Sequence, residues 1–89
     1  FDGGVVSHTI LSKDGKRQTI GAIRPGQYHF KTEEGERMDI ISGECFVKLA
    51  TESLEKKYST GETFFVAPRS SFDITVKEGL TEYLCSFES

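Results

Sequence analysis

Turn-forming residue pairs recur at short, even intervals along this chain, and that spacing limits what it can fold into. Glycine accepts a positive φ and proline presets a corner, so pairs that contain them mark turns. Strands that recur every 8–12 residues or so, with turn signals between them, indicate an all-β sandwich or barrel. The pairs are Gly3-Gly4, Asp14-Gly15, Pro25-Gly26, Glu34-Gly35, Ser42-Gly43, Thr60-Gly61 and Glu78-Gly79.

The segments between these turns are rich in β-branched and aromatic residues, which favour strands. No segment carries the i, i+3, i+4, i+7 stripe of an amphipathic helix, and the charged stretch 51–57 could form one turn at most. With 89 residues the chain has room for one domain, residues 1–89. The expected strands are 5–11, 17–23, 27–32, 36–42, 44–50, 63–67, 71–76 and 81–87.

Alternation along the expected strands separates an interior face from a solvent face. Gly21 interrupts a clean strand, so it predicts either a bulge or a close backbone approach. His29 falls on the solvent side of its strand. The interior set is Tyr28, Phe30 and Thr32; Glu36, Met38 and Ile40; and Phe72, Ile74 and Val76.

The charge balance excludes some partners. The formal net charge is -3 and the pI is near 5.3, and binding to nucleic acid polymers or to an anionic membrane needs clustered Lys and Arg. Uncharged apolar runs are far shorter than the ~20 residues of a membrane helix. Cys45 and Cys85 each lie inside an apolar segment, which suits reduced thiols in a cytoplasmic protein.

Part of the spacing resembles the two sequence motifs of cupin barrels, but without their metal ligands. Gly26, Glu36 and Gly43 stand where the first motif requires them, and Gly61 and Pro68 resemble the second. Residues 30–32 and 72–73 occupy the places of the histidines. A transition metal needs three or four converging N, O or S ligands, so metal-dependent chemistry is not expected.

Read together, the motifs resemble one small cupin family, the pyrimidine/purine nucleoside phosphorylases, over essentially the whole chain. The family's Phe-x-Val-Pro is changed here, since Pro68 stands one residue later. The matching positions are Phe1, Gly3, Val5 and Ser7; Thr19, Gly21, Pro25, Gly26, Tyr28, Phe30 and Thr32; Glu36, Met38, Ser42 and Gly43; Gly61 and Phe64; and Tyr83, Leu84 and Cys85.

The resemblance implies an antiparallel β barrel, or jelly roll, of cupin type that forms a homodimer and needs no metal or other cofactor. It implies phosphorolysis: inorganic phosphate, the co-substrate, attacks C1′ of a purine or pyrimidine nucleoside and releases free base and pentose 1-phosphate. Two alternatives stay open on the residues alone. One is a non-catalytic, metal-free cupin that binds a nucleoside, a sugar or a phosphorylated metabolite, and the other is a structural dimer without a ligand.

Glu36 is the expected catalytic residue. Its place in the alternation directs its carboxylate into the barrel mouth, where it could stabilise a sugar cation, hold ribose hydroxyls or share a proton with a base nitrogen. A strand-end glutamate that is capped by backbone N–H groups or paired with an arginine is the other interpretation.

The remaining candidates fall into two groups. Aromatic and other interior side chains could bind the nucleoside by stacking, although such residues are often plain core. Arginines and hydroxyls could bind phosphate, although they could equally be solvated surface groups. The substrate-binding candidates are Tyr28, Phe30, Thr32, Met38, Phe72 and Tyr83, and the phosphate-binding candidates are Arg24, Arg37, Arg69, Ser70 and Ser71.

Overall fold

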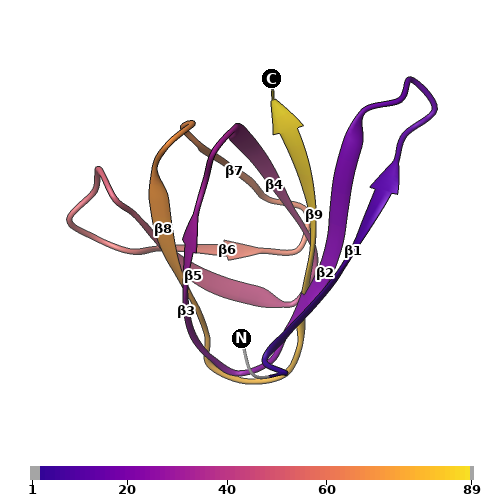
Figure 1. Ribbon diagram of the computed structural model, residues 1–89. Helices are drawn as coiled ribbons and strands as arrows, with labels where there is room; N and C mark the ends of the chain where they lie inside the picture. The colour runs from indigo at the N-terminus through magenta and orange to yellow at the C-terminus, as the bar shows by residue number, and fades with distance from the viewer. Residues whose placement is uncertain (1–2, 89) are drawn as a thin grey trace.

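The computed structural model describes residues 3–88 as two antiparallel β-sheets packed face to face (Figure 1). The larger sheet has the order β1-β2-β9-β4-β7 and the smaller one β3-β8-β5-β6. Phe1, a position of the family pattern, lies outside the described residues. The strands are β1 (Val5–Leu11), β2 (Arg17–Ile23), β3 (Gly26–Lys31), β4 (Gly35–Ser42), β5 (Glu44–Leu49), β6 (Lys56–Ser59), β7 (Thr63–Val66), β8 (Ser71–Val76) and β9 (Thr81–Glu88).

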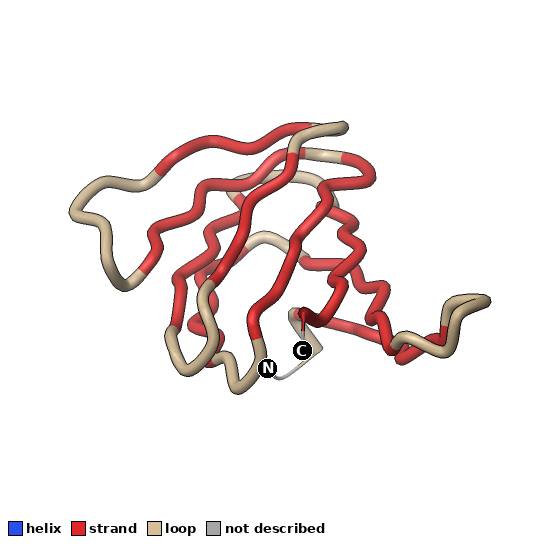
Figure 2. Tube along the Cα trace, turned by 90° about the horizontal axis from the view of Figure 1, so that it is seen from above, coloured by secondary structure: helices blue, strands red, loops and turns tan. Residues whose placement is uncertain are grey.

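The predicted all-β antiparallel class is therefore confirmed, as a jelly-roll-like sandwich. Strand pairing among the described residues leaves the two sheets separate, so the barrel is not closed. The β1–β2 hairpin and the turn between β5 and β6 project on opposite sides of the sandwich (Figures 1 and 2). Across residues 3–88 no helix could cross a bilayer.

The strand boundaries agree closely with the sequence pattern. Strands β1, β2 and β8 begin and end where expected, and the other five predicted strands differ by a residue at one or both ends. The sequence analysis missed β6, a four-residue strand of sequence KKYS. Two lysines and so few residues give a weak local signal, and the strand forms by pairing with β5 through Glu44↔Ser59 and Cys45↔Tyr58.

The predicted interior faces meet between the sheets. Ile40, Ile74 and Val47 are almost fully buried there, and Phe72 packs against Phe30 and Phe64 with ring centroids 5.3 and 5.7 Å apart. His29 points outward as expected, with its Nδ1 2.7 Å from Asp73 Oδ1.

Gly21 is the close approach that its sequence position suggested, and the strand has no bulge there. A Cβ at Gly21 would lie 2.6 Å from the ring of Tyr83, which faces it on β9. The register irregularity lies instead in β4, between Ile40 and Ser42. Glycine therefore leaves the room that the Tyr83 ring needs beside β2 at this point.

The outer face of the five-stranded sheet carries exposed apolar side chains, which include Val6, Ile10, Ile20 and Phe65. The cross-strand pairs Val6↔Ala22, Ile10↔Gln18 and Ile20↔Leu84 lie on this same outer face. Strand β1 is an edge strand that is exposed along almost its whole length. This face and its edge strand form an apolar surface of the kind that can pair with another chain.

Candidate functional site

A cavity of about 140 Å³ lies between the two sheets, walled mainly by apolar side chains. Its polar side chains come from the five-stranded sheet, and the four-stranded sheet adds two aromatic rings and an isoleucine. The lining residues are Thr19, Ile23, Phe30, Glu36, Met38, Phe72, Ile74, Tyr83, Cys85 and Phe87.

Strand register arranges the inner face of the five-stranded sheet in rows across β2, β9 and β4. Glu36 pairs with Phe87 in the outermost row. Cys85 pairs with Thr19 and Met38 in the next row. Exposure falls along this direction, from the half-buried Glu36 and Phe87 to the fully buried Ile23 and Ile74. The row of Glu36 is therefore the mouth, and Ile23 and Ile74 form the deep end.

Glu36 is the one carboxylate among these lining residues. Burial raises the pKa of its carboxyl group, and the charge of Glu34 raises it further. The Cys85 thiol donates a hydrogen bond to the Glu36 carboxylate, which opposes the rise. Glu36 is therefore a half-buried acid next to an apolar space, and it holds its proton to a higher pH than a glutamate in water does.

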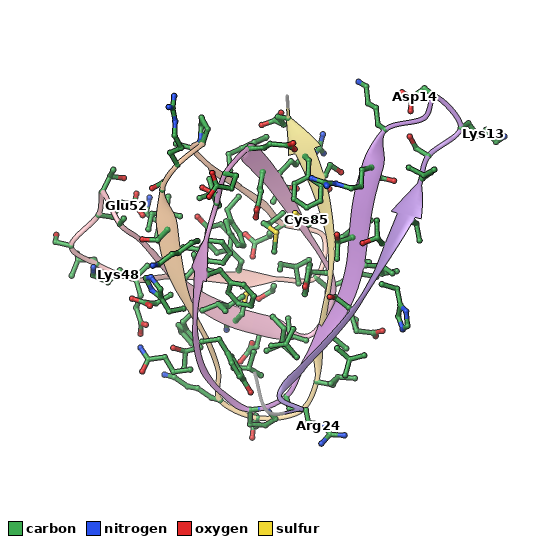
Figure 3. The ribbon with its side chains drawn as sticks, in the orientation of Figure 1. Lys13, Asp14, Arg24, Lys48, Glu52 and Cys85 are labelled. Atoms are coloured by element: carbon green, nitrogen blue, oxygen red, sulfur yellow. The ribbon has the colours of Figure 1, made fainter. Side chains whose placement is uncertain are left out.

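Cys85 and Tyr83 lie deeper than Glu36, and both stay protonated. Burial, together with the neighbouring Glu36, raises the pKa of the Cys85 thiol to about 12, and burial raises the pKa of the Tyr83 hydroxyl. Figure 3 places Cys85 in the interior of the sandwich. A thiol with so high a pKa is a hydrogen-bond donor and not a nucleophile.

Arg17 stands at the mouth, on the inward side of β2. Its guanidinium carbon lies 4.3 Å from the centre of the Phe87 ring, and its Nη2 lies 3.4 Å from the Glu34 carboxylate. Phe87 lies between Arg17 on one neighbouring strand and Glu36 on the other. The Arg17 guanidinium, the carboxylates of Glu34 and Glu36 and the Phe87 ring therefore lie near one another at the entrance of the cavity.

Five of the predicted site residues come together in this cavity: Glu36, Phe30, Met38, Phe72 and Tyr83.

Two predicted substrate-binding residues lie apart from the cavity lining. The Tyr28 hydroxyl donates to the carbonyl of Arg24 at 3.0 Å, near the opposite end of the sandwich. The Thr32 hydroxyl donates to the Ala67 carbonyl at 2.7 Å and accepts from the Ser70 N–H at 3.0 Å. Thr32 therefore ties the β3–β4 turn to the β7–β8 turn.

The structure separates the predicted phosphate-binding residues. Arg24 lies at the end of the sandwich opposite the β1–β2 hairpin tip (Figure 3). Its backbone N–H donates to the carbonyl of Gly4 at 2.8 Å. Arg37 faces outward and pairs with Asp39 at 3.2 Å, in a broad outer groove of about 860 Å³ beside the β1–β2 hairpin.

Arg69, Ser70 and Ser71 lie in and just after the β7–β8 turn, at the mouth end. The Arg69 N–H donates to the Glu33 carbonyl at 3.3 Å, and Arg69 has a positive φ of 51°. This group lies at the same end of the fold as Glu36, because Val66 pairs with Glu36 just before the turn.

Sequence reasoning did not single out Arg17, Thr19, Cys85 or Phe87 as site residues. A signal existed for the first two. Gly21 and Ile23 face inward, so period-two alternation along residues 17–23 also turns Arg17 and Thr19 inward. Phe87 and Cys85 lie on one face of β9 by the same rule.

Within residues 3–88 no three His, Cys, Asp or Glu side chains converge as ligands for a metal ion. His8 and His29 lie on outward faces of different sheets.

Comparison with known proteins gives a consistent result. The family model described as pyrimidine/purine nucleoside phosphorylase matches residues 1–87. A pyrimidine/purine nucleoside phosphorylase from Methylobacillus flagellatus is 51% identical over 88 residues, which are 99% of this chain and 84% of that protein. One from Paraburkholderia xenovorans is 44% identical over 98% of this chain and 81% of its own length.

Solved structures agree on the fold. A protein of unknown function from Acinetobacter sp. ADP1 superimposes with a TM-score of 0.94 at 39% identity, over 99% of this chain and 85% of that one. The DMSP lyase DddQ from Ruegeria pomeroyi reaches a TM-score of 0.85 at 11% identity, over all of this chain and 49% of its own. The second likeness shows a shared cupin-type fold alone.

Proposed function

The chain belongs to the pyrimidine/purine nucleoside phosphorylase family. From this membership we propose which substrates its cavity accepts and which residue takes part in the reaction. As a member of this family, the chain is a nucleoside phosphorylase. The proposal adds that the reaction needs no metal ion, tolerates purine and pyrimidine bases alike, and depends on Glu36.

The observation that carries the proposal is the position of Glu36, the one carboxyl among the residues that line the apolar cavity, at the cavity mouth. Phosphorolysis breaks the bond between C1′ and a base nitrogen, and the electron pair passes to the base. A phosphate oxygen forms the new bond to C1′. We assign to Glu36 the proton that neutralises the departing base, since burial raises its pKa and keeps it protonated at higher pH.

The size of the cavity supports a binding mode in which only part of the nucleoside lies inside it. Ligand sites of ~300 Å³ or more are usual for whole small molecules, and this cavity has about 140 Å³. The base enters between Phe30, Phe72 and Phe87, and the pentose and the phosphate stay at the mouth. Glu36 then stands between the two parts, where the scissile bond lies.

Broad base tolerance follows from the character of the walls. Aromatic rings offer stacking surfaces that every base can use. Few directional hydrogen-bonding groups line the cavity, so little there distinguishes a purine from a pyrimidine.

We also propose that the enzyme is a cytoplasmic homodimer. Both cysteines are buried and free, as suits a reducing compartment. The exposed apolar face of the five-stranded sheet, bordered by edge strand β1, supplies a surface that a second copy can cover.

The proposal is tested by incubating the chelator-treated protein with uridine, cytidine, adenosine and guanosine, each with and without inorganic phosphate. Chromatography follows both free base and pentose 1-phosphate. We expect release from purine and pyrimidine nucleosides that requires phosphate and survives chelation.

A Glu36→Gln variant purified in parallel separates the enzyme's own activity from a contaminating phosphorylase. Equal activity in the variant would remove Glu36 from the mechanism. Activity that disappears with the chelator and returns with an added divalent ion would overturn metal independence, and release confined to one base class would overturn broad tolerance.

A further inference from the structure

We propose that Arg17 binds the phosphate co-substrate at the cavity mouth, a role that rests on the proposed function of Glu36 and was not expected from the sequence. Arg17 lies at the end of β2 on its inward side, with its guanidinium 4.3 Å from the Phe87 ring centre. Phe87 pairs directly with Glu36. An anion held by Arg17 would therefore stand on the same row as the carboxyl that faces the scissile bond.

The stacking on Phe87 suits a phosphate receptor. A guanidinium that lies over a ring keeps its N–H groups directed outward from its edge, where they can form two parallel hydrogen bonds to an oxyanion. The ring also limits the rotamers of a long side chain, so less entropy is lost when the anion binds. Arg17 is thus partly oriented before phosphate arrives.

Glu34 occupies the place that phosphate would take. Its carboxylate lies 3.4 Å from Nη2 of Arg17, and the two side chains remain 41% and 53% exposed. A pair this exposed contributes little stability. A phosphate dianion carries more charge and more acceptor oxygens than a carboxylate, so it can displace Glu34 from the guanidinium.

The other arginines are less well placed. Arg24 lies at the opposite end of the molecule, and Arg37 is paired with Asp39 on the outer face. Arg69 is at the mouth end, but on the β7 side of Glu36, beyond Val66. Arg17 is the arginine seated on an aromatic ring of the cavity wall.

A second observation links Arg17 to the chemistry at Glu36. The positive charge of Arg17 lowers the pKa of the Cys85 thiol, and this thiol donates a hydrogen bond to the Glu36 carboxylate. Two carboxylates and a phosphate dianion would repel one another at the mouth. Glu36 in its neutral form removes part of that repulsion, so phosphate binding and a protonated Glu36 favour each other.

The test compares Arg17→Gln and Arg17→Lys with wild type. The KM for phosphate is measured at saturating nucleoside, and the KM for nucleoside at saturating phosphate. We expect Arg17→Gln to raise the KM for phosphate roughly ten- to a hundred-fold, as loss of a charged hydrogen bond predicts, with the KM for nucleoside within about two-fold. Arg17→Lys should recover part of the loss, because it keeps the charge without the fork.

Arg37→Gln is the matched control, since it makes the same change on the outer face. It should leave both KM values as in wild type, and thermal unfolding verifies that each variant is folded. A wild-type KM for phosphate in folded Arg17→Gln overturns the proposal while leaving the phosphorylase function intact.

Direct binding keeps the two proposals distinguishable. Titration calorimetry with inorganic phosphate should show binding to wild type and Arg37→Gln and a matching loss in Arg17→Gln. If wild type splits no nucleoside, the proposed role of Glu36 fails, and calorimetry still decides Arg17. Equal phosphate binding by wild type and Arg17→Gln, or none by either, overturns the role of Arg17.

Discussion

At the scale of single residues, the cavity concentrates its chemistry in one carboxyl group and its neighbours. Glu36 is half-buried, receives a hydrogen bond from Cys85 and faces an apolar space. A carboxyl group there costs folding free energy when it is ionised, because burial favours its neutral form. Folding stability and the proposed proton transfer therefore both favour the neutral form of Glu36.

Glu36→Gln should lower kcat about 10²- to 10⁴-fold, the usual contribution of a general acid, with a smaller effect on the KM for nucleoside. Steady-state kinetics at saturating phosphate measures this. Glu52→Gln, which changes a glutamate paired with Lys56 in the turn after β5, is the control and should retain wild-type kcat. Loss of activity in both variants to the same degree would contradict a specific role.

The same substitution has a pH signature in stability. The pKa of Glu36 in the folded chain is raised above its ordinary value of 4.5. The stability that its neutral form contributes is therefore complete below that value and is lost as pH rises through the folded-state pKa. Since the glutamine side chain of the variant does not titrate, Tm of wild type relative to the variant should fall as pH increases from about 4 to about 8. A difference that stays constant with pH would show that the carboxyl does not titrate differently on folding.

At the scale of elements, β2 shapes the cavity because Gly21 has no side chain at the point where β2 faces Tyr83. Gly21 leaves room for the Tyr83 ring, and a Cβ there would come within 2.6 Å of it. Tyr83 is 6% exposed and lines the cavity, so it has little room to move away.

Gly21→Ala should destabilise the fold by about 1–3 kcal/mol, the usual range for forcing extra volume into a packed interior. Gly35→Ala is the matched control. Gly35 is also a buried strand glycine, and its added Cβ would meet its nearest atom, the Val66 carbonyl oxygen, at an ordinary 3.5 Å. Urea unfolding measures both variants, and equal destabilisation would show that the contact with Tyr83 is not the cause.

The elements were mostly predictable from sequence because turn pairs and alternation are local signals. They place β1, β2 and β8 at both ends and turn Glu36, Met38 and Phe72 toward the interior. Strand β6 escaped because it depends on pairing with β5.

The site was predictable only in part, because register and turn geometry join residues that are distant in sequence. Alternation identified the inward face of β4, but the contact of Arg17 with Phe87 depends on β2 and β9 lying side by side. Thr32 looked like a ligand hydroxyl, and tertiary structure supplied both of its partners, Ala67 and Ser70.

At the scale of the whole molecule, the exposed face of the five-stranded sheet determines the state of association that we propose. An edge strand and several apolar side chains together make a surface that commonly pairs.

Ile20→Glu, on β2 beside the edge strand of this face, should convert the proposed dimer to a monomer, since it places a charge in an apolar contact. Leu54→Glu is the control, because Leu54 is 75% exposed in the turn between β5 and β6, away from this sheet face. Sedimentation equilibrium measures the mass of each. A wild type that already sediments as a monomer, or an Ile20→Glu variant that stays dimeric, would exclude this face as the interface.

The walls of the cavity are also part of the hydrophobic core. Met38, Phe72, Ile74, Tyr83 and Cys85 belong to both sets. Across residues 3–88 the site has no scaffold separate from this core, and it is a portion of the core that the side chains leave unfilled. If the base enters it as we propose, the base completes the packing, and nucleoside binding should stabilise the fold through the same contacts that form the core.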